Sequence, residues 1–258
     1  GSNMQHRQLW YESFEEYSYL NTIKDNLICP QEVWSYDSTM SHFVDSSGNL
    51  DASVSHSGNM SLKLTGTDSL VQELYLSPTW VDTVSTLLAG KEYYTSEDDE
   101  IIPFRPQTGE YVLSAWVKED QTAFDTLYEN SFIRIEFEDN LGATTTFDYY
   151  PKGVIIEDWQ RIEEKFTVPA NAEIMRIKYM TNNITGWFDD LRIHPFNGNA
   201  KTYAYDFRTL RLMAELDENN YATFYEYDLE GNLVRVKKET VRGIKSLQEN
   251  RQHQVESP

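Results

Sequence analysis

The sequence has only one cysteine, no long apolar run and few basic residues for its length. Because Cys29 has no second cysteine to pair with, an intrachain disulfide is excluded. Since no apolar stretch approaches the length that crosses a bilayer, we expect no membrane insertion. The 22 Lys and Arg residues against 42 Asp and Glu give a formal net charge of -20. A charge of this sign repels phosphate backbones, so we expect no nucleic-acid binding.

The sequence also lacks the spaced motifs of common catalytic and metal sites. Its five histidines are scattered and form no His-x-Glu-x-x-His pattern, and neither a Gly-x-Ser-x-Gly elbow nor a phosphate loop is present. Acidic residues are so numerous that a glycosidase pair can be drawn almost anywhere, which makes such a pair uninformative. We therefore expect a non-catalytic protein.

Alternation between apolar and polar residues dominates the chain. In the run "SFIRIEFE", Ile133, Ile135 and Phe137 fall on one face and charged residues on the other, as in a half-buried antiparallel strand. Turn signals such as Ser57-Gly58-Asn59 separate such runs at short intervals. The pattern predicts an all-β sandwich or jelly roll. The opening "GSNM" reads as an expression scar, so we expect an excised piece of a longer protein.

One segment, residues 92–109, interrupts this rhythm with four acidic residues in a row, Glu97 to Glu100. Carboxylates in such a run can hold a hard cation through oxygen ligands. A solvated surface loop is the favoured interpretation, because charge runs are usually exposed.

The chain changes character after residue 196. Tyr203-x-Tyr205-Asp206 recurs as Tyr225-x-Tyr227-Asp228, an internal repeat with a spacing of 22 residues. With Gly231-Asn232 turning one strand into the next, residues 200–250 resemble the YD-repeat (RHS) family of very large surface and secreted proteins. The first unit departs from the pattern, because "FRTLRL" stands where a glycine turn is expected. The resemblance implies structural β-hairpins that are one fragment of a larger array.

Three ordered motifs mark residues 8–196: "SFEEY" (13–17), "HSGNMSLKLTG" (56–66) and "GWFDDLRIHP" (186–195). The runs "YVLSAWVK" and "WQRIEEKFTVP" fall between them in the expected order. This part of the chain resembles jelly-roll carbohydrate-binding modules, most closely families four, nine and twenty-two of the galactose-binding-like group. The resemblance implies an all-β fold in two parts, a jelly-roll β-sandwich (8–196) followed by a C-terminal β-hairpin repeat segment (200–250).

The last motif raises a question about Asp189. If the motif "GWFDDLRIHP" forms an unbroken strand, one face carries Trp187, Asp189, Leu191 and Ile193. Asp189 then points into a core. A buried carboxylate must be protonated, hydrogen-bonded, paired or bound to a metal. It can accept hydrogen bonds from loop N–H groups, or pair with Lys63 or Arg192.

The resemblance implies a further alternative, a structural Ca²⁺ ion. The matching ligand positions are Glu15, the loop carbonyls around Ser57 to Asn59, and Asp189. Calcium prefers six to eight oxygen ligands that mix carboxylates with backbone carbonyls, which fits this set.

Sugar binding needs exposed aromatic faces flanked by polar groups, and Trp116 is the best candidate. It lies in phase with Ser114 and Lys118, opposite the apolar set that includes Leu113 and Val117. Other aromatic candidates for a concave or loop-edge site are Trp34, Tyr36, Trp80 and the pair Tyr149-Tyr150. For each, packing in the sandwich core is the alternative.

These observations predict a non-catalytic carbohydrate-binding module with a structural calcium, cut from a large exported or cell-surface YD-repeat protein of bacterial type. Its partners are then a glycan and the remainder of the parent protein. The rival is a structural spacer or cap of a YD-repeat shell that binds no sugar, and a third alternative is adhesion through an exposed apolar patch. Open hairpin edges also predict a homo-oligomer.

Overall fold

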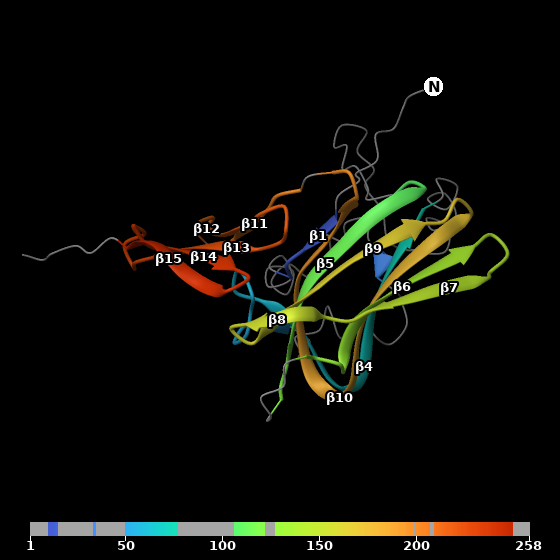
Figure 1. Cartoon of the computed structure of the whole chain (residues 1–258), viewed down its shortest axis with the longest axis horizontal. Coiled ribbons are helices and arrows are strands. Elements are labelled where there is room, and N and C mark those ends of the chain that lie inside the picture. Colours follow the sequence, from blue (N-terminus) through green and yellow to red (C-terminus); the bar gives the residue numbers. More distant parts are fainter. Residues whose placement is uncertain are drawn as a thin grey trace, which may run out of the picture.

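The computed structural model describes residues 10–14, 33–34, 50–76, 106–121, 127–198, 200–206 and 209–249. In these ranges every regular element is a β-strand, and all strand pairs are antiparallel (Figure 1). The described part of the chain contains no helix with the length and apolarity that a membrane span requires.

Two long strands, β4 (Ser61–Tyr75) and β10 (Ala172–Pro195), organise the sandwich. The first half of β10 pairs with the second half of β4 and with β6 (Ser131–Asp139). Its second half pairs with the first half of β4 and with β5 (Gly109–Glu119). A register shift between Thr181 and Ile184 separates the halves. Hydrogen bonding therefore runs through both long strands, and one ten-stranded sheet folds over on itself.

We call the two layers sheet A and sheet B. Sheet A is completed by β2 (Val33–Trp34) beside β4 and by β7 (Thr144–Tyr149) beside β6. Sheet B is completed by β9 (Trp159–Val168) beside β5 and β8 (Lys152–Ile156) beside β9. Two short strands, β1 (Trp10–Glu12) and β3 (Leu50–Asp51), pair with β10 and β4.

The core between the layers follows the predicted alternation. Ile133, Ile135 and Phe137 of β6 are buried against Leu113 and Val117 of β5 and the other members of one apolar cluster. Burying such side chains stabilises the fold by roughly 1.5–3 kcal/mol for each fully buried residue.

The chain then forms a separate five-stranded antiparallel meander, sheet C, which extends to one side of the sandwich in Figure 1. Its strands, in order, are β11 (Thr202–Tyr205), β12 (Leu212–Leu216), β13 (Ala222–Tyr227), β14 (Leu233–Thr240) and β15 (Gly243–Glu249). The predicted fold class, an all-β jelly-roll sandwich with C-terminal hairpins, is confirmed.

Turns in sheet C share one geometry. In residues 217–221 the Asp217 N–H donates to the Tyr221 carbonyl (3.0 Å), and in residues 228–232 the Asp228 N–H donates to the Asn232 carbonyl (3.0 Å). The fourth residue of each turn is left-handed, with φ of 63° at Asn220 and 93° at Gly231. Asparagine and glycine are the residues that adopt this conformation most readily.

The hairpin of the first repeat unit forms without its glycine. Tyr205 pairs with Leu212, and the Asp206 N–H donates to the Arg211 carbonyl at 2.9 Å. Leu210 takes the left-handed conformation, with φ of 55°, which costs a non-glycine residue roughly 1–2 kcal/mol.

The edges of sheet C are β11 and β15. Of the two, β15 carries an extra residue, Leu247, opposite Val236 and Lys237, whereas the register shift beside β11 places the extra residue, Met213, on β12. A bulge on an edge strand hinders edge-to-edge pairing. Association through hairpin edges stays a prediction.

Candidate functional site

The motif "GWFDDLRIHP" lies in β10, but its alternation is broken by a bulge. Phe188 pairs with Val117 and Ile193 with Leu113, on the core face. Between them the register shifts and Asp190 has φ of 49°. The prediction that Asp189 shares the core face of Leu191 and Ile193 is therefore wrong, because the bulge inserts an extra residue. Asp189 pairs with Trp116 and lies on the outer face of sheet B.

Asp189 is nevertheless fully buried, beneath the loop that carries His56 and Ser57. Its Oδ2 accepts the backbone N–H groups of His56 (2.8 Å) and Ser57 (3.2 Å), and its Oδ1 accepts that of Asp190 (2.7 Å). Of the alternatives for a buried Asp189, the structure thus has the one in which loop N–H groups donate hydrogen bonds to the carboxylate. Burial and the charge of Asp190 raise the pKa of Asp189 well above its ordinary value.

The other predicted calcium ligands do not converge on Asp189 as a set of oxygen donors. The Ser57 hydroxyl donates to Asp190 Oδ1 (2.7 Å), the Asn59 amide donates to Asp206 Oδ2 (3.3 Å), and Glu15 lies outside the described residues. Among the residues described, no three or more His, Cys, Asp or Glu side chains are arranged to hold a metal ion. Both Asp189 oxygens already accept N–H groups, so the described residues do not fit a calcium centre, and calcium stays a prediction.

Trp116 lies on the predicted face of β5, but sheet C covers that face. Its side chain is 0% exposed, its ring stacks on His56 (centroids 4.3 Å apart, planes at 14°), and its Nε1–H donates to the Asn220 carbonyl at 2.8 Å. Tyr221 and Ile244 of sheet C complete a second apolar cluster with Trp116, Trp159, Trp187 and Ile156. The prediction of an exposed sugar platform at Trp116 is wrong for this reason.

His56 links the sandwich to sheet C within this covered region. Its Nδ1 lies 2.7 Å from Asp190 Oδ2, and its Nε2 lies 3.1 Å from Glu239 Oε1 of β14. Burial by itself lowers the pKa of His56, but the charges of Glu239 and Asp190 and the hydrogen bonds to both outweigh it and raise that pKa to about 10. At neutral pH the ring is therefore an imidazolium held between two carboxylates.

The remaining aromatic candidates divide in two. Tyr36 and Trp80 lie outside the described residues, and of Trp34 only the backbone, in β2, is described. Tyr149 pairs with Ile133 on the core face and is 9% exposed. It therefore packs in the sandwich core, which was the alternative to sugar binding. Its neighbour Tyr150 is 39% exposed.

Tyr150 belongs to the outer face of sheet A. Its ring stacks on Phe132 of β6, with centroids 4.8 Å apart and planes at 27°. Arg134 lies one row further along β6, with its guanidinium carbon 5.7 Å from the centre of the Phe132 ring. The same guanidinium makes a two-point ion pair with Asp148 of β7, at 2.5 and 2.7 Å. We call Phe132, Tyr150, Arg134 and Asp148 the sheet A cluster.

An ionic network adjoins the sheet A cluster on β6 and β10. Glu136 accepts hydrogen bonds from Arg176 (2.8 Å) and Lys178 (2.7 Å), and Arg176 also pairs with Glu138 (2.6 Å). The two cations lower the pKa of Glu136 although burial opposes this. The face thus places an aromatic pair beside rows of fixed donors and acceptors. The phase of Phe132 and Arg134 in "SFIRIEFE" could have indicated this face from the sequence.

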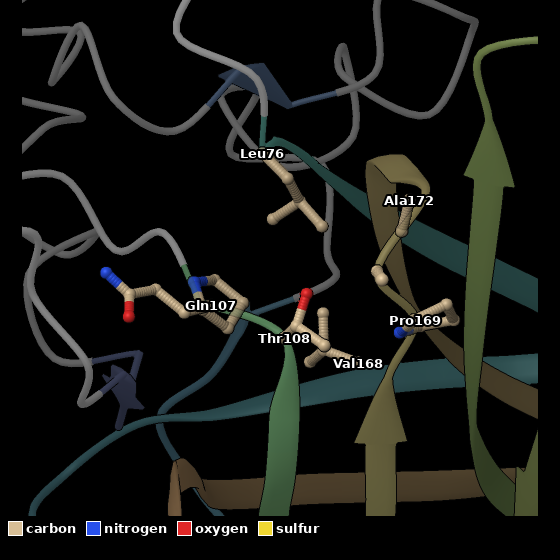
Figure 2. A pocket seen from close by; sticks show the side chains of 8 residues that line it. Leu76, Gln107, Thr108, Val168, Pro169 and Ala172 are labelled. Carbon is tan, nitrogen blue, oxygen red and sulfur yellow. The ribbon is translucent and has the colours of Figure 1, made fainter.

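A hollow of about 340 Å³ lies at the loop edge of the sandwich, where β4 ends and β5 begins. Figure 2 shows Leu76, Gln107, Val168 and Ala172 around it. Among the described residues its lining consists of aliphatic and proline side chains with Gln107 and Thr108, and none of them supplies an aromatic ring on which a sugar can stack.

Comparison with known proteins finds solved structures that resemble this chain but no family to which it belongs. No protein-family model and no curated protein matches the sequence. Solved structures with a similar fold include the xylan-binding domain CBM22-1 of Paenibacillus barcinonensis Xyn10C, at 12% identity and a TM-score of 0.39, covering 72% of this chain and 92% of that domain. A family 22 carbohydrate binding module from the C-terminal part of Clostridium thermocellum Xyn10B is 12% identical with a TM-score of 0.38, covering 73% and 92%.

Another similar structure, of the CBM22-1 and GH10 modules of Clostridium thermocellum Xyn10B, is 15% identical with a TM-score of 0.36. The match covers 56% of this chain and 23% of that one.

Proposed function

We propose that this chain is a non-catalytic glycan-binding module, and that its sugar surface is the outer face of sheet A. One observation carries the proposal: the half-exposed ring of Tyr150, stacked on Phe132, lies beside the paired side chains of Arg134 and Asp148. The apolar C–H face of a pyranose stacks on an aromatic ring. Its hydroxyl groups then find charged donors and acceptors that are already fixed in place.

The outer face of sheet A is also the better of the two outer faces. On sheet B the equivalent aromatic residues, with Trp116 at their centre, are covered by sheet C and unavailable to a ligand. A preformed surface loses little conformational freedom on binding, which favours affinity. The ion pair holds Arg134 in position for this purpose.

We propose that the module has no catalytic role. The buried group of His56, Ser57 and Asp190 contains residue types that occur in hydrolases, but the Ser57 hydroxyl donates its hydrogen bond to Asp190 and not to the imidazole. The His56 side chain is buried between Asp190 and Glu239. A nucleophile also requires access to a substrate, and the side chains of this group are buried.

The test is an immobilised-glycan screen of the whole chain with a matched pair of variants. Tyr150→Ala should lose about 5- to 150-fold in affinity, if a sugar ring stacks with the 1–3 kcal/mol that a base contributes on an aromatic side chain. Tyr203→Ala removes a tyrosine of similar exposure from sheet C and should leave binding unchanged. Equal losses in both variants, or no binding by the unaltered protein to any glycan, would reject the proposal.

A second candidate function, a structural spacer or cap of a larger exported YD-repeat protein, is supported by the contact between the sandwich and sheet C. That contact contains the buried Trp116 cluster and the clamp formed by His56, Asp190 and Glu239. If the two parts act as one rigid unit, calorimetry should record a single unfolding transition. Two separate transitions would argue against a rigid spacer.

A further inference from the structure

Four consecutive backbone carbonyls of sheet C accept hydrogen bonds from side chains of the sandwich. Arg192 of β10 donates to the carbonyls of Asp217 (2.8 Å) and Glu218 (2.9 Å). Arg161 of β9 donates to that of Asn219, and Trp116 donates to that of Asn220 at 2.8 Å. The turn between β12 and β13 is thus held along its whole length by three donors from three strands of sheet B.

These four hydrogen bonds are made to the backbone of the turn. Of its side chains, that of Tyr221 also packs against Trp116 and lies 4.6 Å from the Arg161 guanidinium, and the variants below keep Tyr221. Every residue type has a carbonyl group, so the donors are satisfied by any sequence that folds into the same turn. Among the described residues, one side chain of the turn donates a hydrogen bond to the sandwich: Asn220 Nδ2 donates to the Asp190 carbonyl at 3.1 Å. Its Oδ1 is buried without a hydrogen-bond partner among the described residues, which offsets part of that gain.

The conformation of the turn depends on two features. Asp217 Oδ1 accepts the N–H groups of Asn219 (2.9 Å) and Tyr221 (3.1 Å), and Asn220 is left-handed. Both features recur in exposed turns of the same chain. In residues 139–143 the Asp139 carboxylate accepts the Leu141 and Ala143 N–H groups at 2.9 Å, and Gly142 has φ of 79°.

We propose that the outer face of sheet B is a receptor for a tight β-hairpin turn of the Asp-x-x-Asn/Gly-x kind. Trp116, Arg161 and Arg192 form the binding surface, and it recognises the left-handed turn conformation more than the sequence. In this chain residues 217–221 occupy it. The inference rests on the second candidate function and names the partner: the sandwich caps hairpin arrays whose turns share this geometry.

The test exchanges the sequence of the turn in the whole chain. The triple variant Glu218→Leu, Asn219→Glu and Asn220→Gly gives the docked turn the residues of 229–231 and keeps the left-handed position. Asn220→Val keeps the other turn residues but disfavours that conformation, because a β-branched residue at positive φ is strained. The readout is hydrogen-exchange protection of the Trp116 indole N–H, measured by NMR together with the melting temperature.

We expect the triple variant to keep its protection within about threefold and Asn220→Val to lose at least about tenfold, the ratio that 1.4 kcal/mol represents. Arg192→Met should lose protection as Asn220→Val does. The control Arg235→Met, which removes an arginine that pairs within sheet C, should not. Loss in the triple variant equal to that of Asn220→Val would overturn the inference, as would full protection in both.

A further variant separates this inference from the function on which it rests. Glu239→Gln weakens the clamp at His56 and leaves the turn contacts in place. If Glu239→Gln lowers the protection of Trp116 while Asn220→Val does not, the rigid joint stands and the turn-recognition inference falls. If neither variant changes protection and two unfolding transitions appear, the spacer function falls as well.

Discussion

Because of the clamp at His56, we expect the protein to lose stability as the pH rises into the alkaline range. Asp190 and Glu239 hold the imidazolium on two sides, and Trp116 stacks on its face. Tyr11, whose hydroxyl donates to Asp190 Oδ1 (2.7 Å), has a pKa raised well above 10, so it stays neutral over the range considered. His56 has a pKa of about 10 in the folded protein against 6.5 in its ordinary state.

Because the folded pKa is the higher one, the stabilisation is fully present below about pH 6.5 and is lost as the pH rises through about 10. At 1.36 kcal/mol for each pH unit, the loss between about pH 7.5 and pH 10 is roughly 3 kcal/mol. For a chain of this size that corresponds to a fall in melting temperature of about 6–12 °C.

The assay is a series of thermal melts from about pH 6 to pH 10.5, on the whole protein and on His56→Gln. Other groups also titrate in alkali, and the growing negative charge destabilises both proteins equally. The difference between the two melting temperatures is therefore the quantity to measure. It should shrink by most of the predicted amount as the pH rises, and a difference that stays constant would refute the clamp.

Three further outcomes can be measured. A Cβ at Gly186 would lie 2.5 Å from Ser131 Oγ, so Gly186→Ala should lower the free energy of unfolding by about 1–3 kcal/mol in a urea titration, and adding Ser131→Ala should restore part of it. Burial raises the pKa of Asp51, but hydrogen bonds from Ser53, Trp187 and Lys63 outweigh it and hold that pKa below its ordinary value. Stability is thus lost as the pH falls through the folded pKa, and Asp51→Asn should flatten the acid side of the melting profile. If the predicted structural calcium exists, adding Ca²⁺ to chelator-treated protein should raise the melting temperature; no heat of binding and no shift would remove it.

Local sequence was enough for the strands and for much of the turn chemistry. The period of two in β6 places Ile133 and Ile135 in the core because nothing interrupts that strand. It placed Trp116 on the correct face of β5 for the same reason. The cover of Trp116 lies 104 residues away in the chain, at Asn220, and no local pattern encodes such a contact. Tyr149, the last residue of β7, is buried, whereas Tyr150 directly after the strand is exposed.

The bulge in β10 shows how one residue decides between a core position and a joint between two sheets. Two consecutive aspartates give no signal of phase, so unbroken alternation was the natural expectation for "GWFDDLRIHP". With the extra residue at Asp190, the core keeps Phe188 and Leu191, while Asp190 and Arg192 both reach the contact with sheet C. Without it, Arg192 and Leu191 would exchange faces, because a shift of one residue reverses every side chain beyond it. The clamp and the turn contacts thus depend on the same irregularity, whereas the sheet A cluster, on strands that do not contain it, is independent of both.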